Sequence, residues 1–291
     1  MMKFELQLKQ YQDSIEKHLK ENCCVYPDEP QQTLFDAMRY SLLAGGKRLR
    51  PVLVFDFCRM SGGDWEKALP FAAALEAIHT SSLIHDDLPC MDDDDYRRGR
   101  LTNHKVYGED VAVLAGDALL IAAFSYISKA DFSAETRIRA VEVLADSVGE
   151  LGMVGGQILD IQSEQRQCTE QEVLDIQSRK TGALIRAAAV LGVLAGNGTQ
   201  EQIRAAQDFA DHIGLAFQIR DDMLDQIGSA EVLGKAVHTD ATKNTFVQIY
   251  GIDACDKLVK KHTALAKDAL SAFADNRFML SLSDYLIDRM N

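Results

Sequence analysis

The strongest chemical signal in this sequence is a cluster of aspartates. Six of the ten residues from Asp86 to Asp95 are aspartates, and Arg97 and Arg98 follow almost at once. Carboxylates this close together repel one another unless a counter-charge is present. A solvated acidic helix end would look similar, but this run directly follows an apolar stripe and directly precedes two cations. The pattern therefore favours a cation-binding site over a plain acidic surface.

A second aspartate cluster lies much later in the chain, in another apolar segment. Asp221 and Asp225 are four residues apart, about 40° around an ideal helix, so their carboxylates share one face, and Asp222 lies between them. Like charges so placed destabilise a helix by only a few tenths of a kcal/mol, which a bound cation offsets. Mg²⁺ suits two such clusters because it takes one or two carboxylates and completes its octahedron with waters and phosphate oxygens of a substrate.

The spacing within the first cluster raises a geometric problem. Asp86 and Asp92 are six residues apart, about 240° around an unbroken helix, and could not share a metal there. Pro89 disfavours helical conformation at the preceding residue and lacks a helical hydrogen bond. A bend at Pro89 would bring Asp92 back beside Asp86, whereas a straight helix would make Asp93 the better ligand.

Cations that could bind a second anion lie in several other motifs. Gly45 and Gly46 form a flexible turn that lets backbone N–H groups approach an anion, and Lys47 and Arg50 follow. His79 lies two helical turns before the first aspartate, on the same face. A solvated turn and a core histidine are the alternative interpretations of these features. Further cations accompany the aspartates: Arg97, Arg98, Lys180, Lys235 and Lys243. The set indicates two phosphate sites, one bound through metal and one metal-free.

Composition bounds the partners and the compartment. The chain has 31 Lys and Arg against 44 Asp and Glu, a net charge of −13, which argues against nucleic acid or an anionic membrane as the main partner. The N-terminal segment is charged throughout and has no apolar signal core, and stretches such as Ala187–Ala195 are far shorter than the ~20 residues that span a bilayer. Six scattered cysteines without CxxC pairs fit reduced thiols. We expect a cytoplasmic protein with no integral membrane segment.

The elements that must position these side chains are helices. From Phe71 onwards, apolar or small residues recur at three- and four-residue steps, and alternating strand patterns are nearly absent. Gly, Asn and Asp punctuate the joins, and no linker divides the chain. The pattern predicts one all-α domain over residues 1–291, a single large bundle of roughly ten or more helices. Its longer helices are expected at Val111–Ala130, Glu135–Val154, Gln171–Gly196, Gln200–Ile227 and Ala254–Ala274.

Taken together, these motifs resemble those of the all-trans prenyl diphosphate synthases, close to bacterial farnesyl and plant-type geranylgeranyl diphosphate synthases. The run Ile78–Gly99 is similar to the family's first aspartate-rich motif, in the form with two extra residues before the last aspartate, and Asp221–Asp225 is similar to the second. Other motifs follow in the family's order: Gly45–Pro51, Gly116-Asp117, Gly155–Gln157, Lys180–Gly182, Gly214–Gln218 and Gly234-Lys235. The resemblance covers about residues 30–250 and implies an isoprenoid synthase-like bundle around a central apolar cavity.

The resemblance implies a role for each candidate residue. Six aspartates are expected to hold about three Mg²⁺ ions that bridge the allylic diphosphate: Asp86, Asp87, Asp92, Asp221, Asp222 and Asp225. Four cations are expected to bind isopentenyl diphosphate: Lys47, Arg50, His79 and Arg98. Three are expected to bind the allylic diphosphate: Arg97, Lys180 and Lys235. Three residues are expected to face the reacting carbon: Lys180, Thr181 and Gln218. Lys243 is a further candidate contact, although Asn-Thr-Phe follows it where the family usually has a Tyr-Pro pair.

The implied activity is a prenyltransferase that condenses isopentenyl diphosphate with dimethylallyl or geranyl diphosphate to give farnesyl diphosphate. Ser81 stands where bacterial farnesyl synthases usually carry an aromatic, and with Ser82 it leaves the tail path open. We therefore hypothesise extension to geranylgeranyl diphosphate. Ile121, Phe124 or a partner subunit could supply the floor instead. The resemblance also implies a homodimer.

Three other classes of protein fit less of the sequence. A terpene cyclase shares the first motif but normally carries an Asn/Ser/Glu metal triad in place of the second. A non-catalytic subunit of a heteromeric synthase would usually have lost one aspartate cluster, and both are intact here. A helical di-iron carboxylate protein needs two Glu-x-x-His motifs, and Glu76–His79 is the only one in the chain.

Overall fold

The computed structural model describes residues 4–164, 166–227 and 244–287, and these are helical almost throughout. The longer helices in chain order are α1 (Phe4–Asn22), α2 (Gln32–Leu42), α3 (Leu49–Met60), α4 (Leu69–Asp86), α5 (Asn103–Tyr107), α6 (Glu109–Lys129), α7 (Ala134–Val148), α8 (Met153–Ser163), α9 (Glu170–Gln177), α10 (Ala183–Ala195), α11 (Gln200–Ile227), α13 (Phe246–Tyr250), α14 (Ile252–Ala269) and α15 (Arg277–Ile287). Short turns are the 3₁₀ segments η1 (Trp65–Ala68) and η3 (Leu270–Ala272) and the π-helical segment η2 (Ser178–Gly182). Within the described chain, the strands β1 (Tyr96–Arg97) and β2 (Arg100–Leu101) form one antiparallel hairpin. The predicted all-α class is confirmed.

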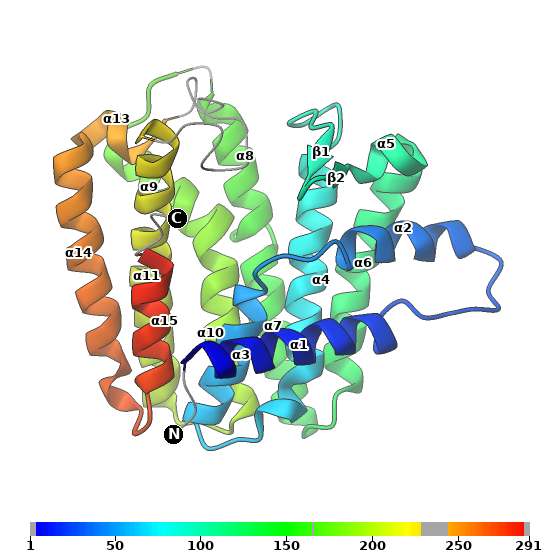
Figure 1. The fold of residues 1–291 in the computed structure, drawn as a ribbon, viewed down its shortest axis with the longest axis horizontal. Coiled ribbons are helices and arrows are strands. Elements are labelled where there is room, and N and C mark those ends of the chain that lie inside the picture. The colour runs from blue at the N-terminus through cyan, green and yellow to red at the C-terminus, as the bar shows by residue number, and fades with distance from the viewer. Residues whose placement is uncertain (1–3, 165, 228–243, 288–291) are drawn as a thin grey trace.

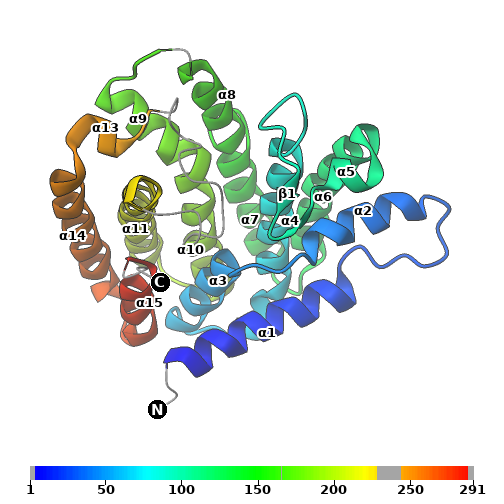
Figure 2. The ribbon, with the colours of Figure 1, turned by 45° about the horizontal axis from the view of Figure 1, so that its top comes forward.

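The long helices stand side by side, and α1 and α2 cross one face of the bundle (Figures 1 and 2). α4 packs most extensively against α6, and α11 against α14, while α10 packs against α3, α7 and α11 and so joins the two halves. α4 and α11 both run toward the end of the bundle that is uppermost in Figure 1. The two aspartate clusters, each at the C-terminal end of its helix, therefore lie at the same end of the molecule.

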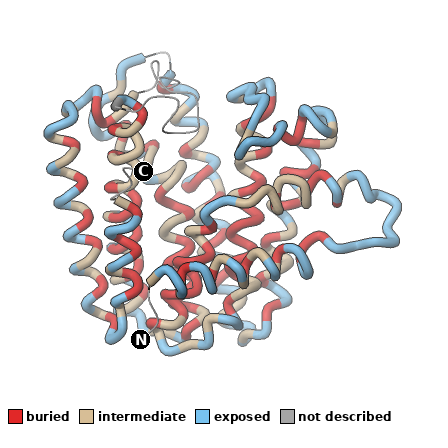
Figure 3. Tube along the Cα trace, in the orientation of Figure 1, coloured by how far each residue is buried: buried red, intermediate tan, exposed pale blue. Residues whose placement is uncertain are grey.

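The centre of the bundle is built from helices that are apolar on all sides. Every residue from Phe71 to Ile78 in α4 is buried, and so is every residue from Ala187 to Leu194 in α10. A helix that is hydrophobic all round belongs in a core. Figure 3 shows the contrast with α14, which exposes one side along its length. The first aspartate cluster is thus carried by an enclosed helix with little freedom to move.

One predicted helix is wrong. The continuous helix expected over Glu135–Val154 is two helices, α7 and α8, separated by residues 149–152. Gly149 ends α7 by donating its N–H to the Ala145 carbonyl oxygen at 2.8 Å. Gly152 approaches α7 so closely that a Cβ there would lie 2.2 Å from a backbone carbonyl oxygen. The apolar spacing continues through the break, so periodicity alone could not reveal it.

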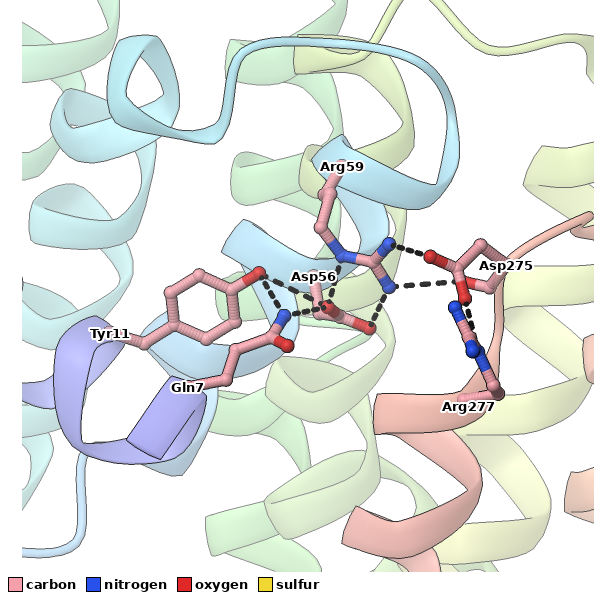
Figure 4. A network of polar contacts seen from close by, with 6 residues as sticks. All are labelled: Gln7, Tyr11, Asp56, Arg59, Asp275 and Arg277. Atoms are coloured by element: carbon pink, nitrogen blue, oxygen red, sulfur yellow. Dashed lines mark hydrogen bonds and ion pairs between the residues drawn. The ribbon is translucent and has the colours of Figure 1, made fainter. Parts of the chain in front are cut away.

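A buried polar network fastens the two ends of the described chain to the centre (Figure 4). Asp56 on α3 accepts hydrogen bonds from the Tyr11 hydroxyl at 3.1 Å and from the Gln7 amide at 3.2 Å, both on α1. The Arg59 guanidinium pairs with Asp56 at 2.8 Å and with Asp275, just before α15, at 2.9 Å. These five residues, called the Asp56 network below, tie α1 and the start of α15 to α3.

Candidate active site

The first aspartate cluster lies in a turn at the end of α4. The helix stops at Asp86, and the chain folds back so that the Asp92 N–H donates to the Asp86 carbonyl oxygen at 2.9 Å. Asp93, with a φ of +52°, closes the turn by donating its N–H to the Leu88 carbonyl oxygen at 3.1 Å. Pro89 lies inside this turn. The bend that brings Asp92 back to Asp86 is confirmed, and the straight helix that would have favoured Asp93 is wrong.

Burial makes two carboxylates of this turn, Asp86 and Asp87, harder to ionise. Burial raises the pKa of Asp86; the Lys180 ammonium opposes the shift, and the neighbouring Asp92 carboxylate adds to it. Burial also raises the pKa of Asp87 to about 6, against the pull of the Arg97 guanidinium, whose Nε lies 2.5 Å from Asp87. Carboxylates gathered away from water are stabilised by an added cation. A cation bound at this turn would therefore stabilise the ionised carboxylates.

A cavity of about 430 Å³ opens beside this turn, between α4, α6, α8 and η2. Its ionic and polar walls include Arg50, His79, Asp86, Lys180 and Thr181, and its apolar walls include Leu120, Met153, Val154, Ile158, Ile161 and Leu184. The predicted central apolar cavity is thus present, and seven of the predicted site residues line it: these five ionic and polar residues together with Ser81 and Ser82.

The two serines proposed as the chain-length gate also line this cavity. Ser81 is buried in the wall, although an ideal helix would turn it about 140° away from Asp86. Ser82 donates its hydroxyl to the His79 carbonyl oxygen at 3.0 Å. Ile121, considered as an alternative floor, is 66% exposed on the outside of α6, so that alternative is wrong for a single chain. Leu120, its neighbour, faces the cavity instead.

A π-helical turn, η2, presents the residues expected at the reacting carbon. The Lys180 ammonium lies 2.5 Å from Asp160 of α8, and the Gln218 amide of α11 donates to the Thr181 hydroxyl at 3.4 Å. Gly156 lets α8 approach this turn, because a Cβ there would lie 2.3 Å from the Lys180 backbone nitrogen. An extra residue in a helical turn often marks a functional site. The turn places Lys180 and Thr181 in the cavity wall and Thr181 beside Gln218, whose own side chain lines a separate hollow, and the role of all three at the reacting carbon stays a prediction.

The second aspartate cluster lies on α11, one turn beyond Gln218. Asp225 is buried, and its Oδ1 has no hydrogen-bond partner among the described residues. Asp222 accepts a hydrogen bond from the Phe246 N–H at 2.8 Å, which anchors the start of α13, and Asp221 is partly exposed. Within the described chain, no three acidic, histidine or cysteine side chains lie close enough to form a metal site by themselves. Each cluster offers part of a coordination shell, which fits an ion that phosphate oxygens and waters complete.

The cationic half of the site surrounds residues Gly45–Arg50, called the Gly45–Arg50 loop below, whose last two residues begin α3. Arg50 lines the cavity with its Nε buried and without a hydrogen-bond partner, and burial lowers the pKa of its guanidinium. The Arg98 guanidinium donates to the Gly45 carbonyl oxygen and lies against Gly46, where a Cβ would come within 2.9 Å of it. Burial, and then the charges of Arg50 and Arg98, hold the pKa of His79 well below its usual range. Its ring is therefore a neutral hydrogen-bonding group among cations.

Comparison with known proteins identifies this arrangement. The family model described as Polyprenyl synthetase matches residues 31–274. The chain belongs to the polyprenyl synthetase family. Among its relatives, it is 46% identical to the dimethylallyltranstransferase of Fischerella ambigua (strain UTEX 1903), across 91% of this chain and 77% of that protein. It is also 46% identical to the heterodimeric geranylgeranyl pyrophosphate synthase large subunit 1, chloroplastic, of Arabidopsis thaliana, across 89% of this chain and 72% of that protein.

Solved structures agree with this membership. The apo FPP/GFPP synthase of Zymomonas mobilis superposes with a TM-score of 0.88 at 34% identity, covering 98% of each chain. The putative farnesyl-diphosphate synthase of Marinomonas sp. MED121 gives 0.84 at 34% identity, covering 99% of this chain and 100% of that one. The isoprenoid synthase-like fold is confirmed, and so is the interpretation of this polyprenyl synthetase as a short-chain prenyl diphosphate synthase.

The sequence of this polyprenyl synthetase did not predict every residue that contacts the site. Asp160, the partner of Lys180, was not singled out, although a lone acid between Leu159 and Ile161 on an apolar helix was an available signal. Lys235, expected to contact the allylic diphosphate, and Lys243, the further candidate contact, lie outside the described residues.

Proposed function

We propose that this polyprenyl synthetase condenses isopentenyl diphosphate with dimethylallyl or geranyl diphosphate to give farnesyl diphosphate, extends it to geranylgeranyl diphosphate, and uses Mg²⁺. One observation carries the proposal: a single cavity combines apolar walls from α6 and α8 with Asp86, Lys180 and Arg50. An isoprenoid tail suits the apolar walls, and a diphosphate suits the charged part.

The cofactor proposal rests on the two carboxylate clusters at one end of the bundle. Asp86, Asp87 and Asp92 would hold Mg²⁺ from α4, and Asp221, Asp222 and Asp225 would hold it from α11. The unpartnered Oδ1 of Asp225 and the raised pKa of Asp86 both support this, because each is relieved by a bound cation. When bound, Mg²⁺ neutralises the charge that develops on a departing diphosphate.

The chain's own residues then supply the remaining steps. Lys180 and Arg97 bind the allylic diphosphate as its bond to carbon breaks, and the electron pair of that bond leaves with the diphosphate. The Thr181 hydroxyl and the Gln218 amide, 3.4 Å apart, direct their dipoles at the allylic cation that remains. The apolar walls exclude water that would capture this cation. The double bond of isopentenyl diphosphate attacks it, a carbon–carbon bond forms, and the departing diphosphate accepts the proton that is then lost.

The second substrate is assigned to the cationic half. Lys47, Arg50 and Arg98 would bind the diphosphate of isopentenyl diphosphate through charge, and neutral His79 through a hydrogen bond. The buried, unpartnered Nε of Arg50 supports this, since an anion would complete it. The group contains no carboxylate of either aspartate cluster, so it is proposed to act without metal.

A homodimer is proposed from the exposed face of α6, and a cytoplasmic location from the six scattered cysteines without CxxC pairs. Leu114 and Ile121, seven residues apart on that helix, are 58% and 66% exposed. α6 is the one described helix that is long and apolar enough to cross a membrane, judged by length and composition only, and 33% of its apolar stretch is buried. A second copy of the chain would cover this face as a protein interface does.

Product analysis tests the proposed function directly. The purified chain is incubated with dimethylallyl diphosphate, excess isopentenyl diphosphate and Mg²⁺, and the dephosphorylated products are separated by length. We expect C15 and C20 alcohols, none with EDTA, and a particle of twice 32.2 kDa by light scattering. Cyclic hydrocarbon formed from farnesyl diphosphate alone would identify a terpene cyclase. Turnover that requires another protein would identify a non-catalytic subunit.

A further inference from the structure

One cation of the Gly45–Arg50 loop turns away from the cavity. Arg48 has a φ of +49°, and its side chain is fully buried. Its guanidinium donates to Glu16 of α1 at 2.7 Å, to Glu76 of α4 at 2.5 Å and to the Leu42 carbonyl oxygen at the end of α2 at 2.8 Å. The rigid fork of a guanidinium can serve three acceptors at once. This one side chain therefore fastens the loop to three helices.

The Glu76 carboxylate influences other cations of the site besides Arg48, its hydrogen-bond partner. Its side chain is 2% exposed, and its Oε2 has no hydrogen-bond partner among the described residues. The Glu76 carboxylate also raises the pKa values of Arg50 and Arg98, against the lowering that burial causes in both. Three arginines thus share the field of one buried carboxylate, while only Arg48 among them donates a hydrogen bond to it.

The position of Glu76 on α4 links this pair to the substrate site. His79 follows one helical turn later, and both side chains lie on the side of α4 that faces the loop, since Arg48 bonds to Glu76 and Arg50 lowers the pKa of His79. A bond from Arg48 to Glu76 therefore fixes the loop against the part of α4 that carries His79.

We propose that Arg48 and Glu76 are positioning residues for the metal-free diphosphate site. They hold the loop so that Lys47 and Arg50 meet His79 and Arg98, and Glu76 offsets part of the charge that would otherwise drive these cations apart. This inference rests on the proposed function of those four residues. It divides the loop's cations by role: Lys47 and Arg50 bind the substrate, and Arg48 orients them.

The test uses the full chain with Glu76→Gln and, independently, Arg48→Lys. Glu76→Gln keeps the shape and removes the charge, and Arg48→Lys keeps the charge but cannot reach three acceptors. Calorimetric titration with isopentenyl diphosphate in EDTA should show binding weakened about tenfold in each variant. The Michaelis constant for isopentenyl diphosphate should rise by the same factor, while that for dimethylallyl diphosphate stays within about twofold.

Asp56→Asn is the matched control. It breaks a buried carboxylate–arginine pair of the same kind on α3, in the Asp56 network, whose residues do not line the cavity. It should lower the unfolding midpoint and leave both Michaelis constants unchanged. If Glu76→Gln and Arg48→Lys behave like this control, the pair is merely structural and the inference is overturned. If the wild-type chain itself fails to bind isopentenyl diphosphate in EDTA, the proposed metal-free site is wrong, and the positioning role proposed for Arg48 and Glu76 is wrong as well.

Discussion

The Asp56 network and the active site both bury charged side chains, but they differ in how completely those side chains are paired. Both carboxylate oxygens of Asp56 accept hydrogen bonds, from Gln7, Tyr11 and Arg59. In the active site, Arg50 Nε and Asp225 Oδ1 are buried without a hydrogen-bond partner in the described chain. Folding alone completes the first set, whereas the second keeps buried polar atoms that a bound ligand can complete.

This difference has an energetic meaning. A buried polar atom without a partner costs about 1–3 kcal/mol, and a protein keeps such atoms where binding later satisfies them. Burial raises the pKa of both Asp56 and Asp86, so the two regions differ in hydrogen-bond pairing and not in the cost of burying a carboxylate. Substitutions in the two regions should therefore separate stability from turnover.

The largest effect is expected from Asp86→Ala and Asp221→Ala. Each removes a proposed Mg²⁺ ligand, and kcat should fall by roughly a thousandfold or more at saturating Mg²⁺. The urea midpoint of unfolding should change little, because burial disfavours the ionised Asp86 carboxylate and Asp221 is partly exposed. Steady-state kinetics with both substrates provides the measurement. Activity close to that of the wild type in either variant would contradict the metal assignment.

The opposite result is expected in the Asp56 network. Asp56→Asn leaves the Arg59 guanidinium without its buried counter-charge and should lower the free energy of unfolding by roughly 2–3 kcal/mol. Turnover should stay within about twofold, because the network touches no wall of the cavity. Urea unfolding followed by circular dichroism measures the first quantity. A tenfold loss of kcat would show that the two regions are coupled after all.

The sequence predicted the turn at the end of α4 better than it predicted where neighbouring cations point. Aspartate spacing and the proline between Asp86 and Asp92 were sufficient to anticipate the turn, since both are local properties. Arg48 and Arg50 are two residues apart, yet one is buried against Glu76 and the other lines the cavity. That distinction depends on contacts with α1 and α4, which are distant in sequence.

The same holds for the fold: features set by neighbouring residues in the sequence were predicted, whereas features set by contacts between distant residues were not. Apolar periodicity located the long helices, but it joined α7 and α8, because the break at Gly149 and Gly152 depends on how closely two helices approach. The interruption at η2 was likewise not anticipated within the helix predicted over Gln171–Gly196. Its extra residue is held by contacts with α8 and α11 and carries no local sequence signature.

A smaller effect tests the proposed division between the two diphosphate sites. Lys47→Ala and His79→Ala should each raise the Michaelis constant for isopentenyl diphosphate about tenfold, and that for the allylic substrate much less. His79→Gln should retain most of the affinity, because the neutral ring supplies a hydrogen bond and no charge. Equal effects on both substrates would mean that the cations are wrongly divided.

Product length should respond to the cavity wall rather than to its charges. Ser81→Phe adds an aromatic ring to the wall of the 430 Å³ cavity and should shift the ratio of C20 to C15 products several-fold toward C15. Ile138→Phe, at a 64% exposed position on α7 that does not line the cavity, is the matched control and should leave the ratio unchanged. Chromatography of the dephosphorylated products gives the ratio. If the wild-type chain releases only C15 with excess isopentenyl diphosphate, Ser81 is not the gate.

The smallest effect concerns how the free energy of unfolding of the unliganded chain decreases at acidic pH. Burial and the neighbouring arginines hold the pKa of His79 well below 6.5, so below that pH the unfolded chain binds a proton that the folded chain does not. Stability linked to His79 is therefore complete above pH 6.5 and is lost as the pH falls further. Between pH 7.5 and 5.5 the wild type should lose about 1 kcal/mol more unfolding free energy than His79→Gln, which cannot titrate. Urea titrations of both proteins at the two pH values measure this difference. Equal losses would mean that the ring accepts a proton as readily in the folded chain as in the unfolded one. The cationic half would then not disfavour a further positive charge, and it would lack the excess of positive charge that distinguishes it from the Asp56 network.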